Sequence, residues 1–280
     1  MTEIDYGRFH ERLELARAAG TDARWELLRA FQEEWGYTPS GAAKAEGDGL
    51  DDVDEDDLAR TDPSLPVPAA LRTWWQLPYN SFADRPGLYW TNPEWPPTLR
   101  PDPTGYGASG ALPAENPFTG PDEDLRVCVF MAEYEYCNEW GYPAARAHLA
   151  DPPALVSVQD EQGKDTWLRQ SHSLSEFFLH LAVNRLPAHF GWTVHTDGLE
   201  PEAMTRLHTH LRPLGLLPWR ELSSEAEYFG GRDVIVQHDT GFGDWEIIAY
   251  GRTKGALLRL ADVLGVDWSD EIEPPDEDDE

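Results

Sequence analysis

The first 36 residues carry two stretches with helical spacing. Apolar side chains recur three or four positions apart before Gly20, at Tyr6, Phe9, Leu13 and Ala16. After a cap at Thr21 or Asp22, a second set precedes Gly36, at Trp25, Leu28, Phe31 and Trp35. This spacing places each set near one face of a helix, and glycine ends each pattern. We expect residues 1–37 to form a helical pair that docks its apolar stripe on the rest of the chain.

The next apolar pattern opens a core segment that we place at 63–190. The sequence LPVPAALRTWW sets Leu71, Trp74 and Trp75 on the buried side of a short helix. A buried strand is predicted over 125–133 (LRVCVFMAE), and a second candidate strand spans 136–142. Because 40% of the residues are hydrophobic, most of the chain can fold around a buried core despite its charge.

The end of the core segment reads as a hairpin followed by a helix. DPPALVSV turns at its prolines into a strand, and residues 165–169 can pair with that strand across the turn EQGK. Ser173 fits the N-cap of a capping box in which Glu176 reaches back to the cap. The helix that begins there is expected to run to about Arg185.

Residues 78–124 interrupt the core with a long loop. They hold ten Pro and five Gly, which precludes long helices and central strands. The same stretch carries seven large aromatic residues, more than a disordered linker usually does: Tyr79, Phe82, Tyr89, Trp90, Trp95, Tyr106 and Phe118. We therefore expect an ordered loop that wraps the core.

The segment 191–268 returns to alternating strands and helices and is treated as a C-terminal lobe. Pro201 suits the first turn of one helix, and Thr253 can cap a final helix that Gly265 stops. Strand patterns occur at 214–219, 233–238 and 245–250, the last two joined by the turn DTGFGD.

Charge sets the class of partner. The chain carries 52 acidic and 22 basic residues, a formal charge of −30, and eight acidic residues fall in each of two runs, 46–57 and 270–280. The first run lies in a predicted solvated linker, 38–62, and the second in a disordered tail, 269–280. Without both runs the charge is still −14. Such a chain repels nucleic acid and anionic membranes and attracts a basic protein partner.

The sequence also bounds location. No apolar run approaches the roughly 18–20 residues that span a bilayer. The N-terminus lacks a basic stretch followed by an apolar one, so no secretory signal is visible. The two cysteines, Cys128 and Cys137, are too few for a disulfide framework. We expect a cytoplasmic protein.

No metal or cofactor site is predicted. His208 and His210 lie two positions apart, which points them about 200° away from each other on a helix. The acidic run from Asp52 resembles a calcium loop, but its sixth position is Asp57 instead of Gly and its twelfth is Pro63 instead of Glu. We therefore expect calcium ions to be attracted to this acidic run as loose counter-ions, without a defined coordination site.

Nucleophilic and acid–base patterns are equally weak. Residues 107–111 (GASGA) are not a GxSxG elbow, and Cys128 alternates with apolar neighbours as a buried, inert thiol does. Gly241-Phe-Gly243 fits a hairpin rather than a phosphate loop. Glu133 and Glu135 form one of many carboxylate pairs in an acidic chain, so their pairing carries little weight. We expect no enzyme.

Three segments in order resemble the SUKH superfamily, the Smi/Knr-like regulators of cell-wall assembly and bacterial immunity proteins. They are LPVPAALRTWW, VCVFMAEYEYCNEWGYP, and DPPALVSV with the later Trp167 and SLSEFFLHL. The resemblance covers roughly 63–185. The Glu-Asn-Gln signature of many members is represented here by Glu133 and by Glu135-Tyr-Cys-Asn138.

The resemblance implies an α+β fold, a bent and mostly antiparallel sheet with flanking helices, and a non-catalytic binding module. Bacterial members neutralise a cognate toxin by occluding it, and a nuclease, whose substrate groove must be basic, would suit the negative body. The expected partner contacts are Glu133, Glu135 and Tyr136, with Trp90 and Trp95 as anchors. A regulatory scaffold and an enzyme based on the C-terminal lobe are the alternatives.

Overall fold

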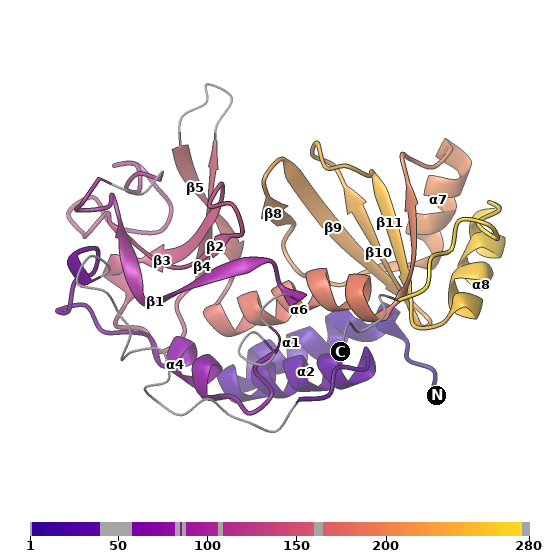
Figure 1. Ribbon diagram of the computed structural model, residues 1–280, viewed down its shortest axis with the longest axis horizontal. Coiled ribbons are helices and arrows are strands. Elements are labelled where there is room, and N and C mark those ends of the chain that lie inside the picture. The colour runs from indigo at the N-terminus through magenta and orange to yellow at the C-terminus, as the bar shows by residue number, and fades with distance from the viewer. Residues whose placement is uncertain are drawn as a thin grey trace. The chain divides into compact units, whose positions relative to one another are not determined.

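The computed structural model describes residues 2–39, 58–81, 85, 88–105, 109–159 and 165–275. The chain divides into two compact units: Met1–Thr38 with Phe178–Glu280, and Pro39–Phe177. Each unit contains an antiparallel sheet, and the predicted α+β class is confirmed (Figure 1). Most of the predicted linker 38–62, the turn 161–164 and the end of the acidic tail lie outside the described residues.

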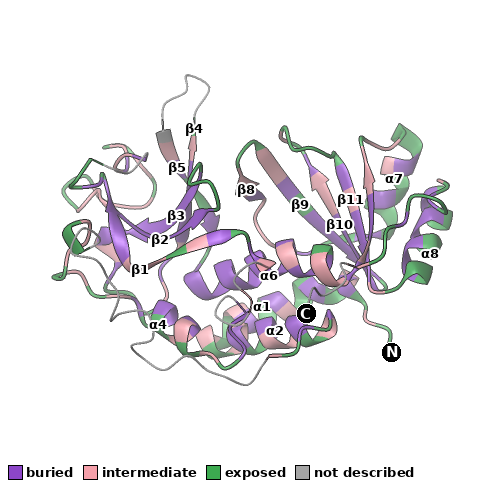
Figure 2. Cartoon of the chain, viewed as in Figure 1, coloured by how far each residue is buried: buried purple, intermediate pink, exposed green. Residues whose placement is uncertain are grey.

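The unit Pro39–Phe177 is built on a five-stranded sheet. Its strands are hydrogen-bonded in chain order: β1 (Thr91–Arg100), β2 (Val127–Glu133), β3 (Glu139–Pro143), β4 (Ala154–Gln159) and β5 (Asp165–Ser171). Helix α4 (Ala69–Gln76) precedes the sheet, and the short helix η3 (Ala144–Arg146) follows β3. Every residue of β2 is buried, as its apolar run predicts (Figure 2).

Aromatic residues fill the core of this unit. Phe130 and Trp140 pack against Phe177, with ring centroids 5.1 and 5.9 Å apart. Phe177 lies in the first turn of α6 (Leu174–Phe190), where the Ser173 hydroxyl accepts from the Glu176 N–H, as the capping pattern predicts. A Cβ on Gly141 would lie 2.7 Å from the Cys128 carbonyl oxygen, so only glycine lets β3 approach β2 this closely.

The prediction that residues 78–124 form one long loop is partly wrong. Residues 91–100 form β1, the longest strand of the sheet, although they contain three prolines. Proline is tolerated there because β1 is an edge strand, and its pairing with β2 shifts register between Pro93 and Thr98. Residues 109–125 do wrap the core: Leu112 and Phe118 cover the apolar side chains of Val127, Val129, Leu155 and Trp167.

The other unit combines the N-terminal helices with a second sheet. After η1 (Tyr6–Arg8), α1 (Phe9–Ala19) and α2 (Thr21–Glu34) form the predicted pair. The sheet runs β6-β11-β10-β9-β7, with β8 also on β9; the strands are β6 (Trp192–Thr196), β7 (Arg212–Pro213), β8 (Trp219–Glu221), β9 (Ser224–Gly231), β10 (Val234–Asp239) and β11 (Ile247–Gly251). Helices α7 (Pro201–His210) and α8 (Lys254–Leu264) share one apolar core with it.

Several sequence boundaries shift. The predicted strand at 214–219 is wrong, because the left-handed Gly215 separates the short strands β7 and β8. The second candidate strand begins at 139 rather than 136, since residues 134–138 form a turn. Helix α6 continues past Arg185 to Phe190, because the buried Leu186 extends its apolar face.

The division into units also differs from the expected one. The N-terminal pair, expected to dock on the rest of the chain, belongs to one unit with residues 178–280, and α6 contributes to both units. Tyr6 stacks on Trp35 with centroids 5.7 Å apart, and the Asp233 N–H donates to the Ile4 carbonyl, which ties the N-terminus to the β9–β10 turn. Helical spacing predicted the apolar stripe but not the surface that it meets.

Candidate partner-binding surface

Four of the five predicted contact residues meet at the turn between β2 and β3. Glu133 ends β2, and Glu135 and Tyr136 lie in the turn. Trp90 precedes β1, whose first residue Thr91 pairs with Glu133 across the strands. Antiparallel pairing therefore brings together residues that are more than 40 positions apart in the chain.

Glu133 organises this turn from inside. Its side chain is only 8% exposed, and its carboxylate Oε2 accepts from the N–H groups of Glu135 at 3.0 Å and Cys137 at 3.3 Å. Its carbonyl accepts from the Tyr136 N–H, and Tyr136 has a φ of 61°. Glu133 thus acts as a positioning residue of the turn, and the expectation that it contacts a partner directly does not fit its burial.

A second side chain holds the same turn from β1. Asn92 Nδ2 donates to the carbonyl oxygens of Glu133, at 3.1 Å, and Tyr134, at 2.8 Å. At the far end of the turn, Asn138 Nδ2 donates to the Ser157 carbonyl at 2.6 Å. These bonds fix the backbone on both sides of the exposed residues, so a partner would meet a preformed surface.

The turn presents aromatic rings beside a carboxylate. Trp90 is 63% exposed, Tyr134 is 56% exposed and Tyr136 is 53% exposed, while Glu135 is also exposed. The rings of Trp90 and Tyr134 meet edge to face, with centroids 5.3 Å apart. Tryptophan and tyrosine are the residues most enriched at binding hot spots. We call these four residues the aromatic turn.

Tyr134 is missing from the sequence prediction. Its signal is the alternation Glu133-Tyr134-Glu135-Tyr136 after an apolar strand, but the two predicted strands, 125–133 and 136–142, leave Tyr134 between them. Trp95 differs in the opposite sense: it is half-buried and packs edge to face on Trp75, with centroids 5.8 Å apart. Its packing is that of a core residue, away from the aromatic turn.

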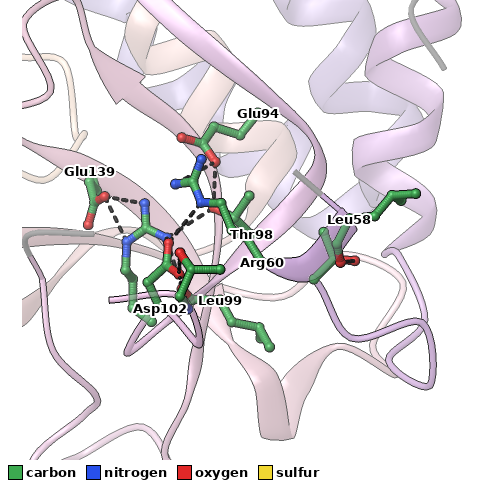
Figure 3. A network of polar contacts seen from close by, with 10 residues as sticks. Leu58, Arg60, Glu94, Thr98, Leu99, Asp102 and Glu139 are labelled. Carbon is green, nitrogen blue, oxygen red and sulfur yellow. Dashed lines mark hydrogen bonds and ion pairs between the residues drawn. The ribbon is translucent and has the colours of Figure 1, made fainter. Parts of the chain in front are cut away.

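A buried ionic network links β1, β3 and the segment before α4 (Figure 3). Arg100 on β1 donates through Nε to Glu139 Oε1 at 2.8 Å, and its Nη2 also pairs with that oxygen. Arg100 Nη1 donates to the Leu99 carbonyl, while Arg60 Nε donates to Asp102 Oδ2 at 2.8 Å. The network fixes Glu139, the first residue of β3 after the aromatic turn.

The charged groups of this network compensate one another. Burial alone would raise the pKa of Asp102, but hydrogen bonds from Thr104 and Arg60 outweigh it and lower that pKa. The Leu99 N–H donates to the Arg60 carbonyl at 2.8 Å, so the last residues of the predicted linker 38–62 are tied to β1. Arg60 and Arg100 face three carboxylates, those of Glu94, Asp102 and Glu139.

The residues considered for chemistry lie elsewhere. Cys128 is buried in β2, and burial raises the pKa of its thiol to about 12, so the thiol stays protonated near neutral pH. His208 packs on Phe229 and His238 in the other unit. Among the described residues, no three His, Cys, Asp or Glu side chains are grouped as a metal ion would require. The Asp52 segment lies outside those residues.

Comparison with known proteins adds no relative. No family model, curated protein or solved structure matches the chain. Within the described part of the chain, every helix is too short or too polar to cross a bilayer.

The role of Glu133 can be tested directly. Replacing Glu133 by Ala removes the acceptor of two turn amides, and hydrogen bonds to a carboxylate contribute about 1.5–3 kcal/mol. We expect the amide protons of Glu135 and Cys137 to exchange about 10-fold faster or more, as measured by NMR hydrogen exchange. Glu202→Ala, an exposed carboxylate on α7, is the control. Unchanged exchange at both amides would contradict the positioning role.

Proposed function

We propose that this chain is a non-catalytic binding protein that docks a basic protein partner through the aromatic turn. The observation that carries the proposal is the preformed cluster of Trp90, Tyr134 and Tyr136 beside Glu135. Exposed aromatic rings lose unfavourable contact with water when a partner covers them, and the fixed backbone reduces the entropy that binding costs. The overall charge of −30 would accelerate encounter with a basic surface.

Within this class, the SUKH resemblance supports an immunity protein of the bacterial cytoplasm that neutralises a cognate toxin by covering its active site. A nuclease toxin fits best, because its groove must attract a polyanion and the same field attracts this chain. Direct binding of nucleic acid or of an anionic membrane is not part of the proposal. The acidic runs at 46–57 and 270–280 favour the second candidate, a regulatory scaffold that recruits partners through its charged segments.

The test is co-expression with the toxin candidate encoded by the adjacent gene, followed by growth rescue and co-purification. The proposal expects rescue together with a stable complex that leaves the toxin inactive. Toxicity that persists despite full expression of this chain would contradict an immunity role. An adjacent gene that encodes no toxin would favour the scaffold.

The contact surface is tested by single variants of the aromatic turn. Tyr134→Ala and Trp90→Asn are expected to weaken the complex about 10- to 30-fold each, because each removes an exposed anchor. Asparagine is chosen at Trp90 because that residue has a φ of 48°, which asparagine tolerates. Leu15→Ala, an exposed apolar residue on α1, is the matched control. Dissociation constants are measured by calorimetry; equal values for all three variants and the unmodified chain would exclude this surface.

A further inference from the structure

Another exposed aromatic residue, Phe242, lies on the loop between β10 and β11. Phe242 is 91% exposed, the highest value among the large apolar side chains of the described residues. Leu222, on the turn between β8 and β9, is also exposed. The residue after it, Ser223, accepts through its carbonyl from the Phe242 N–H at 2.8 Å. Two neighbouring hairpins therefore carry apolar side chains into solvent at one end of the sheet.

The loop is built to hold Phe242 outward. Asp239 Oδ1 accepts from the N–H groups of Glu225, at 2.9 Å, and Gly241, at 2.7 Å. A Cβ on Gly243 would collide with the other Asp239 carboxylate oxygen, so this approach requires glycine. The buried Asp239 carboxylate and the backbone bonds to Ser223 and Glu225 hold the loop in a conformation in which Phe242 is exposed.

The same loop borders a cavity with an acidic lining. The cavity, of about 450 Å³, is lined by nine residues, of which four are carboxylates and none is Lys or Arg: Asp197, His238, Asp239, Thr240, Gly241, Gly243, Asp244, Trp245 and Glu246. Asp197 and Asp244 form no ion pair with the described residues. Trp245 is 40% exposed and lies beside His195, with ring centroids 5.7 Å apart.

These features select one kind of occupant. A guanidinium group pairs with carboxylates through two parallel hydrogen bonds and stacks on aromatic faces, whereas a lysine ammonium is a compact, strongly hydrated charge. A second copy of this chain would bring like charges together and is disfavoured. We propose that the cavity beside loop 239–246 is a docking site for an arginine side chain of a partner protein, held against Trp245 by the carboxylates of Asp197 and Asp244, with the exposed ring of Phe242 on the same loop as a second aromatic contact for the partner.

This site is separate from the aromatic turn. It lies in the unit formed by residues 1–38 and 178–280, whereas Trp90, Tyr134 and Tyr136 lie in the other unit. The proposal does not depend on the immunity function, because it concerns the chemistry of the bound side chain rather than the identity of the partner. Either proposal can fail without the other.

The test uses the full chain and two fluorescein-labelled peptides of equal charge, one containing four arginines and the other four lysines in the same glycine-serine background. Fluorescence anisotropy at 150 mM salt is expected to show at least 5-fold tighter binding of the arginine peptide. Phe242→Ser and the double change Asp197→Asn with Asp244→Asn should each weaken arginine binding at least 5-fold. Tyr134→Ala, in the aromatic turn, should leave it unchanged.

Two results would overturn the proposal. Equal affinity for both peptides would mean that only the general negative charge attracts them. Equal binding by the unmodified chain and Phe242→Ser would place the arginine elsewhere. Because Phe242 is almost fully exposed, its replacement removes no core packing, and circular dichroism of the variant checks that the fold is kept.

Discussion

Replacing Arg100 by Met is expected to destabilise the unit Pro39–Phe177 by about 3–5 kcal/mol, the cost of breaking a buried ion pair from one side. Arg100 and Glu139 are both buried, and Glu139 Oε2 already has no hydrogen-bond partner among the described residues. Removing the guanidinium leaves the Glu139 charge without compensation. The measurement is urea unfolding followed by both tryptophan fluorescence and circular dichroism, since the chain has two units.

The double variant Arg100→Met with Glu139→Leu provides the control for this interpretation. It removes both charges, so it should recover a large part of the lost stability. Arg29→Met, at a half-buried arginine on α2 whose pairs with Glu26 and Glu33 lie at the surface, should change stability by less than about 1 kcal/mol. If Arg100→Met lowered the free energy of unfolding no more than Arg29→Met does, the ionic network of Figure 3 would not contribute to the stability of the fold.

Acidification from pH 7 to pH 4.5 is expected to remove about 2.5 kcal/mol of stability through His180 alone. Its side chain is fully buried against Trp219 and Tyr228, and neither ring nitrogen has a hydrogen-bond partner among the described residues. Burial lowers the pKa of His180 from 6.5 to about 3. Below pH 6.5 the unfolded chain binds a proton that the folded chain excludes, so stability is highest above pH 6.5 and falls towards pH 3.

Unfolding free energies of the unmodified chain and of His180→Leu, measured at several pH values, isolate this contribution. The unfolding free energy of His180→Leu relative to that of the unmodified chain should rise by about 2.5 kcal/mol between pH 7 and pH 4.5, because leucine binds no proton. His210→Leu, an exposed histidine on α7, should follow the unmodified chain at every pH. Parallel curves for the unmodified chain and His180→Leu would contradict a buried, neutral His180.

Local patterns predicted the elements whose stabilising contacts are close in sequence. The apolar stripe of α2, the strand β2, the Ser173 cap and the Thr253 cap of α8 all lie where spacing and capping chemistry place them. Strand β1 could not be predicted in this way. Its prolines indicate a loop, and only its position at the sheet edge makes them compatible with a strand.

The candidate surface shows the same division. Sequence resemblance pointed to Glu133, Glu135 and Tyr136, but only the folded turn shows that Glu133 faces inward and Tyr134 outward. The contact of Arg100 with Glu139 joins two charged residues 39 positions apart, and no sequence period relates them. Ionic pairs of this kind depend on strand register, which a single sequence does not reveal in a Pro-rich segment.

The shared helix α6 determines how this chain should be cut. A fragment spanning 63–190 would carry Phe178 and Leu181 without α2, although Phe178 contacts Trp25 of that helix with ring centroids 6.1 Å apart. A fragment beginning at 178 would instead start in mid-helix and lack the Ser173 cap. Recombinant fragments truncated at either point would expose apolar surface and tend to precipitate. Binding studies and crystallisation therefore require the full-length polypeptide.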